Sequence, residues 1–589
     1  MTFPISPLND ALHSQFGRSY QYSEDNKSWR AATSPAPEIN ISTVTAFETA
    51  TDLPLVNNNP GDTTFVAEDN SFRLWTGSGW FEIALINSSP TITTGANATY
   101  TLNSDGTPTV ITMAATDPEG TPIIWAYQVT SGSLEDTTVT NVDGVFTITP
   151  GATDATFGLT FTASDGVNID TSASSFTLVF IPDWTVTTLL HTLDDPNAYG
   201  TSASDFFGRS VAIDGNYAVV GAIYEDDDHH AGGLYSGKAY IFNVTTGALV
   251  HTLSNPNAYG PSSNDLFGIS VAISGNYAIV STNGEGDAGG ANSGKAYIFD
   301  VTTGALVHTL NNPNAYGTSA GDYFGGTVAI SGNYAIVGAL NEDDGHNQSG
   351  KAYIFDVTTG ALVHTLDNPN PFGTPVDDHF GEKVAISGNY AIVGVRQEDD
   401  TSGGNRNSSG KAYIYNVTTG ALVRTLNNPN AYGTGYQDNF GYSVAISGNY
   451  TIICARGDGD AGGADSGKAY IFNVTTGALV HTLSNPNAYG SSDSDYFGES
   501  VGISGNYAIV STPYEDDASG NDSGKAYIFD IVTGTLLKTL DNPNAYGTSA
   551  GDEFGNAVAI SGDYVIVGAQ YEDDAGGTNS GKAYIFKAG

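Results

Sequence analysis

The sequence has a single cysteine in 589 residues, Cys454, so an intrachain disulfide and a cysteine-based zinc cluster are both excluded. Cys454 lies in the strand-like run TIICA, and we expect it to be a small buried residue. No stretch approaches the roughly 18 consecutive apolar residues of a membrane-spanning helix. Residues Met1 to Tyr20 have neither a basic start nor an apolar run. We therefore expect no secretion signal and no membrane insertion.

Positive charge is also scarce. Lysine and arginine together number 19, against 63 aspartates and glutamates, which gives a net charge of −44. Such a charge repels nucleic acid and anionic membrane surfaces and favours cations. We therefore expect no nucleic-acid partner.

Patterns for catalysis are lacking as well. The histidines His229, His230, His346 and His379 have no shared metal-ligand spacing. No Ser/His/Asp set or phosphate-binding glycine loop can be placed on a strand-to-helix turn, because no helical pattern is evident. A glycosidase needs two carboxylates across one cleft, whereas the acids of this chain recur evenly. We therefore expect that the protein is not an enzyme.

What the chain does have is a repeat. A Phe-Gly pair recurs seven times at steps of 56 to 60 residues, a period typical of propellers and stacked repeats. The pairs begin at Phe207, Phe267, Phe324, Phe380, Phe440, Phe497 and Phe554.

Each repeat contains four short strand-like runs, which we call A, B, C and D. In residues 267–310 they begin at Ser270, Asn276, Lys295 and Ala305. Short glycine-containing turns separate A from B and C from D, as expected for antiparallel hairpins. Four up-and-down strands in seven units predict a seven-bladed β-propeller over residues 184–589.

The two ends of this region predict how the ring closes. The last repeat stops after its strand C, at Lys582–Phe586, and residues Thr188–Leu193 resemble a strand D that has no A, B or C before it. Because proteins avoid unpaired sheet edges, we expect these two segments to pair and complete the seventh blade.

The B–C and D–A loops are predicted to share one face of the disc, and the B–C loops are acidic. Each B–C loop has two acids separated by one residue. Each D–A loop has an aspartate two residues before the Phe. The pairs are Glu225/Asp227, Glu285/Asp287, Glu342/Asp344, Glu398/Asp400, Asp458/Asp460, Glu515/Asp517 and Glu572/Asp574, and the single aspartates are Asp205, Asp265, Asp322, Asp378, Asp438, Asp495 and Asp552.

Two interpretations of these acids stay open. Three carboxylates per blade, with carbonyls and water, could hold Ca²⁺, which takes about 6–8 oxygen ligands. Alternatively, the aspartates cap turns and the acids are solvated or balanced by lysine. Each B–C loop runs into a Ser-Gly-Lys segment, with Lys238, Lys295, Lys351, Lys411, Lys468, Lys525 and Lys582.

An aromatic residue also recurs in every D–A loop. A ring of aromatics on a loop face is a candidate contact for a host receptor, because such rings stack on sugars. Packing between blades is the alternative, and identical residues in every blade favour it. The residues are Tyr199, Tyr259, Tyr316, Phe372, Tyr432, Tyr489 and Tyr546.

Three smaller regions precede the propeller. Residues 1–44 are predicted to be an attachment segment or linker with one hairpin at most. Residues 45–87 form a small β-hairpin module, in which Trp75 and Trp80 flank a turn as a cross-strand pair or a sugar-stacking site. Residues 88–183 have evenly spaced strands that predict an immunoglobulin/cadherin-like β-sandwich. In the sandwich Asp117 and Asp165 are turn residues or calcium ligands. The chain is therefore predicted to be all-β.

The repeat resembles the FG-GAP family, the propeller unit of integrin α-chains. The family's Phe-Gly stands here as Phe324-Gly325 and its Gly-Ala as Gly338-Ala339. In the integrin pattern an aspartate-rich calcium loop lies between them, but here that interval is only Ser331–Tyr334. The integrin calcium ligands therefore do not transfer to this chain.

Residues 45–180 resemble modules of structural proteins from tailed phages of marine bacteria. The matching segments are Asp52–Pro54, Asn59–Asp62, Trp75–Trp80, Ala84–Pro90, Asp105–Thr109 and Phe161–Gly166. This resemblance implies a virion component in a tail fibre, a tail appendage or a head decoration. Its partners would be other virion proteins through the N-terminal region and a host glycan or protein through the propeller, and self-association into a homo-oligomer stays open. The alternatives are a purely structural decoration, a polysaccharide-degrading enzyme and a bacterial surface adhesin.

Overall fold

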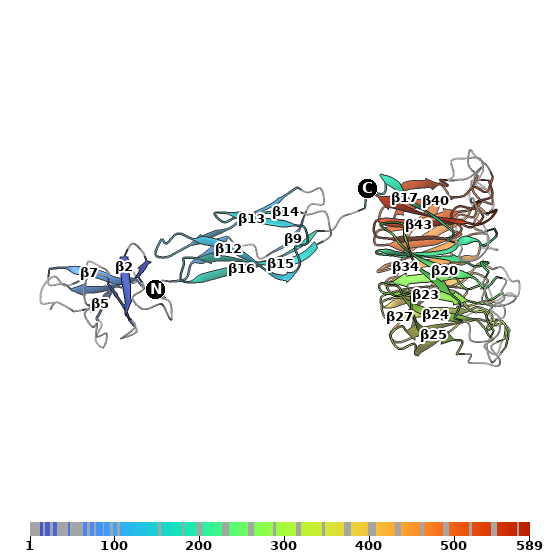
Figure 1. Cartoon of the computed structure of the whole chain (residues 1–589), viewed down its shortest axis with the longest axis horizontal. Helices are drawn as coiled ribbons and strands as arrows, with labels where there is room; N and C mark the ends of the chain where they lie inside the picture. The colour runs from blue at the N-terminus through green and yellow to red at the C-terminus, as the bar shows by residue number, and fades with distance from the viewer. Residues whose placement is uncertain are drawn as a thin grey trace. The chain divides into compact units, whose positions relative to one another are not determined.

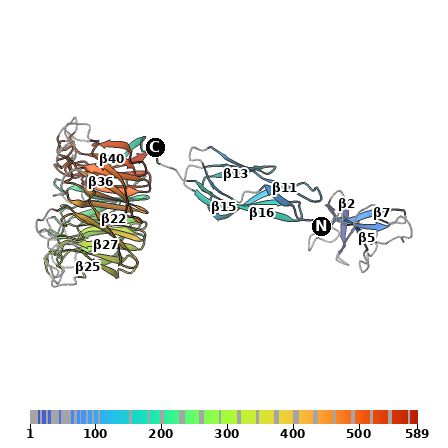
Figure 2. The same ribbon diagram turned by 180° about the vertical axis from the view of Figure 1, so that it is seen from behind.

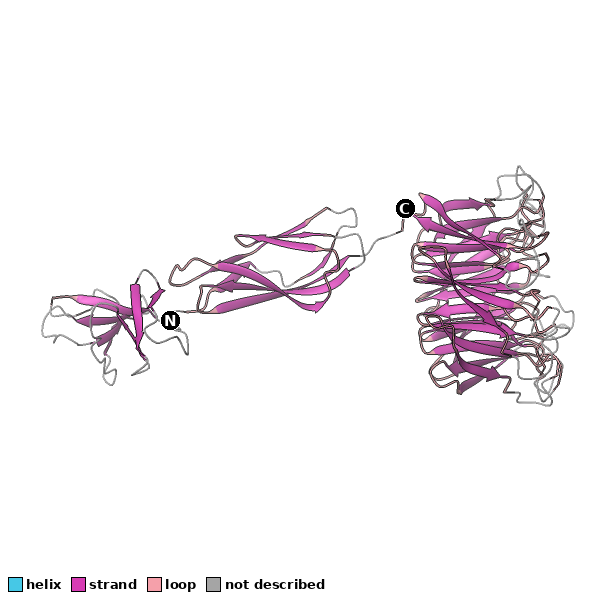
Figure 3. Cartoon of the chain, in the orientation of Figure 1, coloured by secondary structure: helices cyan, strands magenta, loops and turns pink. Residues whose placement is uncertain are grey.

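The computed structural model shows only strands and connecting segments in the part of the chain that it describes (Figures 1 and 3). The chain divides into two compact units, Met1–Ile181 and Pro182–Gly589. The described residues are 12–15, 18–23, 28–31, 45–47, 53, 63–66, 71–75, 78–85, 88–94, 98–102, 107–150, 155–178, 182–196, 203–226, 235–256, 264–286, 290–313, 320–343, 348–369, 378–398, 408–429, 438–459, 465–486, 494–516, 521–543, 550–573 and 577–589.

The first sheet of the N-terminal unit has three antiparallel strands, β1 (Leu12–Gln15), β2 (Arg18–Ser23) and β3 (Ser28–Ala31). The expectation of one hairpin at most was therefore wrong. The alternation in Ser19–Tyr22 is the two-residue period of a strand, and β2 pairs on both of its edges.

The second sheet has the order β4-β5-β6-β7, with β4 parallel to β5. Trp75 and Trp80 are direct cross-strand partners, and their ring centroids lie 5.6 Å apart in an edge-to-face arrangement. The interpretation as a cross-strand pair is therefore confirmed. The strands are β4 (Thr45–Phe47), β5 (Thr63–Val66), β6 (Ser71–Trp75) and β7 (Trp80–Leu85).

Residues 88–178 form three further sheets, with the orders β10-β14-β13, β11-β8 and β12-β15-β16-β9. They share one buried core that includes Phe146, Phe157, Phe161 and Phe176. The strands are β8 (Thr91–Thr94), β9 (Thr99–Thr101), β10 (Thr109–Thr112), β11 (Ala114–Thr116), β12 (Ile124–Gly132), β13 (Thr138–Val142), β14 (Val145–Thr149), β15 (Ala155–Ser164) and β16 (Ile169–Leu178).

Two aspartates of this region hold turns. Asp117 Oδ1 accepts hydrogen bonds from the backbone N–H groups of Glu119 and Thr121, at 3.0 and 2.7 Å. Asp165 Oδ1 accepts two bonds of 2.6 Å from Val167 and Asn168. These contacts support the turn role that the sequence suggested for both residues.

The second unit consists of seven four-stranded antiparallel sheets, the blades of a β-propeller. In the first six blades the strands A to D are β18 (Phe207–Asp214), β19 (Tyr217–Ala222), β20 (Lys238–Asn243) and β21 (Leu249–Ser254); β22 (Val271–Ser274), β23 (Tyr277–Thr282), β24 (Lys295–Asp300) and β25 (Leu306–Asn311); β26 (Phe324–Ser331), β27 (Tyr334–Ala339), β28 (Lys351–Asp356) and β29 (Leu362–Asp367); β30 (Lys383–Ser387), β31 (Tyr390–Val395), β32 (Lys411–Asn416) and β33 (Leu422–Asn427); β34 (Phe440–Ser447), β35 (Tyr450–Ala455), β36 (Lys468–Asn473) and β37 (Leu479–Ser484); and β38 (Val501–Ser504), β39 (Tyr507–Thr512), β40 (Lys525–Asp530) and β41 (Leu536–Asp541).

The seventh blade closes the ring as predicted. It combines β42 (Val558–Ser561), β43 (Tyr564–Ala569) and β44 (Lys582–Ala588) with β17 (Thr187–Asp194) from the start of the unit. Strand β17 pairs antiparallel with β44 from Thr187↔Ala588 to Asp194↔Lys582. The backbones of Asp183 and Gly589 also exchange two hydrogen bonds. In Figure 2, which gives the view from behind, the C-terminus again lies at the edge of the disc.

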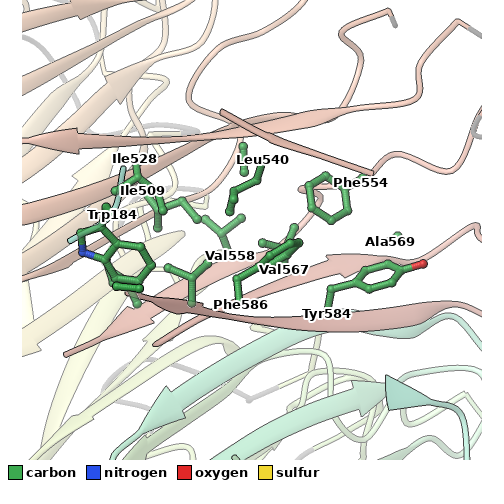
Figure 4. Packing of buried hydrophobic residues seen from close by; sticks show 14 residues of the cluster. Trp184, Ile509, Ile528, Leu540, Phe554, Val558, Val567, Ala569, Tyr584 and Phe586 are labelled. Atoms are coloured by element: carbon green, nitrogen blue, oxygen red, sulfur yellow. The ribbon is translucent and has the colours of Figure 1, made fainter. Parts of the chain in front are cut away.

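Trp184 anchors this closure. Its side chain is buried in a cluster shared by the sixth and seventh blades, which includes Ile509, Ile528, Val558 and Phe586 (Figure 4). The other propeller clusters are built in the same way, each between two neighbouring blades. Full burial of one such apolar side chain contributes about 1.5–3 kcal/mol.

The first strand of each blade contacts the first strand of the next, and β42 contacts β18. These seven strands therefore form the innermost ring. Close approach of the blades requires the glycine after each Phe. At Gly381, with φ +91°, an added Cβ would lie 2.1 Å from the carbonyl oxygen of Lys351 in the preceding blade.

The strand directions place the loops. Strand A starts and strand B ends at the same face, from which the B–C and D–A loops leave, and we call it the loop face. The A–B and C–D turns lie at the opposite face. Because β17 begins beside the last residue of β44, the chain enters the propeller at the face of the turns. The loop face is the far end of the unit from that entry point.

Candidate functional site

The first acid of every B–C loop pair is buried at the base of its loop and accepts a hydrogen bond from a strand C tyrosine hydroxyl. In the third blade both carboxylate oxygens of Glu342 lie 2.6 Å from the hydroxyl of Tyr353. The seven acids are fully buried. The pairs are Glu225–Tyr240, Glu285–Tyr297, Glu342–Tyr353, Glu398–Tyr413, Asp458–Tyr470, Glu515–Tyr527 and Glu572–Tyr584.

Burial dominates the acid–base properties of these pairs. Burial raises the pKa of Glu515 to about 7, and the nearby Asp495 adds to the rise, while hydrogen bonds from Tyr527 and Thr512 oppose it. Burial also raises the pKa of Tyr527, and the charge of Glu515 raises it further. The tyrosine therefore stays protonated and donates to the carboxylate.

The same acids fasten the two ends of each B–C loop together. The backbone carbonyl of Glu342 accepts the N–H of Gly350 at 2.9 Å, just before strand C begins. The equivalent bond is present in the other six blades, at 2.8–3.0 Å. The first acid of each pair therefore supports the loop through both its side chain and its backbone.

The aspartate before each Phe-Gly has a matching role in the D–A loop. In the second to seventh blades its Oδ2 accepts a hydrogen bond of 2.8–2.9 Å from the asparagine ten residues earlier, as in Asn312–Asp322. In the D–A loop that precedes the first blade, Asp195 occupies the asparagine position, ten residues before Asp205. All seven aspartates are buried.

The strand C lysines are buried beside these carboxylates. Lys351, Lys525 and Lys582 form ion pairs with acids at the end of strand D in the same sheet, and the Lys525–Asp541 distance is 2.6 Å. Lys295 Nζ lies 4.0 Å from Glu285 Oε1. Of these contacts only that of Lys295 involves an acid of the B–C loops, so balance by lysine and binding of calcium both stay open for the loop acids.

The second acid of each pair lies outside the described residues, at Asp227, Asp287, Asp344, Asp400, Asp460, Asp517 and Asp574. Among the described residues, no three His, Cys, Asp or Glu side chains gather in a way that could hold a metal ion. The described carboxylates already have protein partners. A calcium site in these loops would therefore depend on the second acids, and calcium binding stays a prediction.

The aromatic ring predicted for the D–A loops also lies outside the described residues, at Tyr199, Tyr259, Tyr316, Phe372, Tyr432, Tyr489 and Tyr546. Of the single histidines, His379 is described and contacts the side chains of Gln348 and Gln397. Cys454 is buried as predicted, and burial raises the pKa of its thiol to about 12. The described segments include no apolar helix of membrane-spanning length.

The sequence reasoning missed the partners of the acids. The strand C tyrosines and the asparagines of the Asn-Pro segments were not singled out, although their near-invariance from repeat to repeat was visible. A group of charged and aromatic residues on the innermost ring was not predicted either. The repeat pattern draws attention to positions that stay the same in each blade, and these residues differ between blades.

A family model described as the FG-GAP repeat matches the chain seven times. The matched residues are 197–242, 258–299, 314–355, 375–415, 431–472, 488–529 and 544–586, about half of the chain and once in each blade. No curated protein matches the sequence.

Two solved structures with which the chain aligns are also propellers. The WD40 domain of Pan2 from Neurospora crassa has 11% sequence identity and a TM-score of 0.39, with 70% of this chain and 98% of that chain covered. The β-propeller domain of the Trilobed protease from Pyrococcus furiosus has 8% identity and a TM-score of 0.37, with 65% and 90% covered. The blade count rests on the strand pairing of this chain.

Proposed function

Because the chain belongs to the FG-GAP repeat family, we propose that its propeller binds a surface or a protein partner through the loop face, without catalytic turnover. The observation that carries this proposal is the construction of the loop bases. Fourteen loops leave one face of the ring. A buried tyrosine–acid bond holds the base of every B–C loop, and an asparagine–aspartate bond holds the base of six D–A loops. Loops on a rigid scaffold are the usual place for binding sites.

We further propose that the chain is a phage virion protein, located in a tail fibre, a tail appendage or a head decoration. The motifs in residues 45–180 that resemble marine tailed-phage proteins support this role. In this arrangement the N-terminal unit attaches to other virion proteins, and the chain enters the propeller at the face opposite the loops. The loop face would then be presented to the host surface.

We propose an immunoglobulin/cadherin-like sandwich for residues 88–183 as the spacer of this arrangement. Its support is the packing of three sheets, antiparallel except for the parallel pair β16–β9, over the single core around Phe146 and Phe161. Sheets that share a core in this way are typical of sandwiches.

A competition assay tests the binding role. Phage particles that carry this chain are mixed with host cells while the purified full chain is added, and the unbound infectious particles are counted. We expect added chain to slow adsorption in a dose-dependent way, while an unrelated protein of similar net charge has no effect. If the chain neither binds the cells nor competes, the adhesion role is wrong and a purely structural decoration is favoured.

Calcium binding at the B–C loops is proposed separately, with Asp227 and its six equivalents as ligands. Bound calcium would stabilise the folded chain according to its concentration and affinity, by about 2.7 kcal/mol at 100 times the dissociation constant. The unfolding midpoint measured with chelator and then with added calcium tests this. An unchanged midpoint would favour the lysine-balanced alternative.

A further inference from the structure

Two positions of the repeat differ between blades although their surroundings hardly change. Both lie where the inner strands meet the loop face, one two residues after the Phe and the other directly after strand B. The first position holds Arg209, Ile269, Gly326, Glu382, Tyr442, Glu499 and Asn556, and the second holds Ile223, Asn283, Leu340, Arg396, Arg456, Pro513 and Gln570. The repeat therefore requires no single residue type at these positions, and the contacts made there differ from blade to blade.

In the fourth to sixth blades these positions and the neighbouring Lys383 build one connected group, which we call the inner-ring cluster: Glu382, Lys383, Arg396, Tyr442, Arg456 and Glu499. Arg396 Nε lies 2.8 Å from Glu382 Oε2, and Arg456 Nε lies 2.8 Å from Glu499 Oε2. The hydroxyl of Tyr442 donates to Glu499 Oε1 at 2.8 Å and accepts from Arg456 Nη1 at 3.1 Å.

Tyrosine rings surround the cations of the cluster. The guanidinium carbon of Arg456 lies 4.0 Å from the ring centroid of Tyr496 and 4.8 Å from that of Tyr442. Arg396 and Lys383 also approach the ring of Tyr442, at 5.3 and 5.8 Å. These distances are within the range of cation–π attraction.

One ion pair of the cluster is poorly satisfied. Arg456 Nε and Glu499 Oε2 are close, but the N–H does not point at the oxygen, and neither buried atom has a hydrogen-bond partner among the described residues. A buried donor without a partner costs about 1–3 kcal/mol. The four side chains of the two ion pairs are still 17–30% exposed, so a ligand can reach them.

Positive charge is concentrated at this point of a strongly acidic chain. Four of its 19 cationic side chains, Arg209, Lys383, Arg396 and Arg456, lie here. Burial lowers the pKa of Lys383, Glu382 and Glu499 oppose this, and the charges of Arg209 and Arg396 lower it further. Since Arg209 belongs to the first blade and Lys383 to the fourth, these charges share one space around the axis. The two glutamates lessen this lowering of the Lys383 pKa without cancelling it, so a further carboxylate beside Lys383 would favour its charged form.

We propose that the inner-ring cluster binds an acidic sugar unit, with Arg396, Arg456 and Lys383 around its carboxylate. Arginine presents a planar fork of donors that matches a carboxylate in two parallel bonds. This inference rests on the proposed binding function and names the class of ligand.

The cluster suits a sugar better than an acidic peptide. Glu382 and Glu499 offer acceptors for hydroxyl groups, which a sugar has next to its carboxylate and an acidic side chain lacks. The rings of Tyr442, Tyr496 and Tyr514 lie against Arg456, and these cation–π contacts hold the guanidinium that would bind the carboxylate. The net charge of −44 repels densely charged polyanions, whereas a glycan with spaced carboxylates carries less charge per length.

Calorimetric titration of the full chain tests the inference. The probe is tri-galacturonic acid, and its fully methyl-esterified form is the neutral control. We expect the acid to bind one site per chain, at least about tenfold more tightly than the ester. Binding of the ester with equal affinity, or no binding of the acid, would overturn the inference. Equal binding of a penta-glutamate peptide would overturn the choice of sugar over peptide.

Variants place the site. We expect Arg396→Gln and Arg456→Gln each to weaken binding of the acid about tenfold or more. Lys538→Gln makes the same change in net charge on the outermost strand β41 and should leave binding unchanged. Glu382→Gln should strengthen binding severalfold, because it frees Arg396 from its internal partner. This variant keeps the test valid if loss of an arginine impairs folding, and an equal or weaker affinity would count against the site.

The two proposals fail in different ways. Competition with adsorption but no binding of the acidic sugar leaves the proposed function standing and rejects the sugar site. Binding of the sugar without any competition supports the site and rejects a role in adsorption.

Discussion

The interior of the blades and the loop-face end of the innermost ring differ in how closely their residues repeat from blade to blade. In the interior, each blade has the same buried tyrosine–acid pair, and the asparagine–aspartate bond recurs in six. On the ring, the position of Tyr442 in the fifth blade holds Ile269 in the second and Gly326 in the third. Repetition therefore marks what keeps every blade folded, and variation marks where the ring stops being symmetric.

For the interior, we expect the largest effect from a substitution where the ring closes. Trp184→Ala removes the side chain that fills the cluster between the sixth and seventh blades, and we expect a loss of about 3–5 kcal/mol in the free energy of unfolding. Denaturant unfolding measures it. Val186→Ala, at a side chain that is 56% exposed, should change stability by less than about 0.5 kcal/mol. Similar effects of the two variants would contradict closure through Trp184.

The pH dependence of stability tests whether burial disfavours the charged form of the acids in the blade interior. Burial raises the pKa of Glu515 to about 7 from its usual value of 4.5, so its stabilising contribution is complete below pH 4.5 and is lost as the pH rises to about 7. We expect this loss to be roughly 2–3 kcal/mol.

Glu515→Gln should remove that part of the pH dependence in unfolding curves measured between pH 4.5 and 8. Asp516→Asn, at the exposed neighbouring carboxylate, should keep it. An unchanged slope in the Glu515→Gln variant would show that another group titrates in this range.

Removal of a single tyrosine hydroxyl compares the two regions directly. Tyr353→Phe removes the hydroxyl that donates to the buried Glu342, and we expect it to cost about 1–3 kcal/mol. Tyr323→Phe, directly before Phe324 at the loop-face end of β26, where other blades have Leu266 or His379, should cost less than about 0.5 kcal/mol. Thermal unfolding of the two variants gives the comparison, and equal losses would contradict the distinction between interior and ring.

We expect the smallest effect from a substitution that restores the common residue of the repeat at its one exception. Asp195→Asn restores the asparagine of the other six D–A loops, replaces one of two buried carboxyl groups and should stabilise the chain by about 0.5–2 kcal/mol at neutral pH. The reverse change in the second blade, Asn255→Asp, should destabilise it. A lower unfolding midpoint for Asp195→Asn would show that Asp195 has a role of its own.

The sequence predicted the propeller because the repeat combines two local signals, the two-residue period of the strands and glycine at the turns. The incomplete blades at the two ends then left one arrangement, with Thr188–Leu193 beside Lys582–Phe586, and the observed register confirms it. The three-stranded sheet of residues 12–31 was missed, because short polar strands give a weak pattern.

The sequence by itself determined the number of blades, the face on which the loops gather and the buried state of Cys454, since all of these follow from local periodicity repeated along the chain. Only the tertiary structure decided what the acids do. A carboxylate such as Glu342 and a hydroxyl such as that of Tyr353 are eleven residues apart, and they meet because strands B and C lie side by side. The inner-ring cluster depends even more on the fold, because its residues come from separate blades and only closure of the ring brings them together.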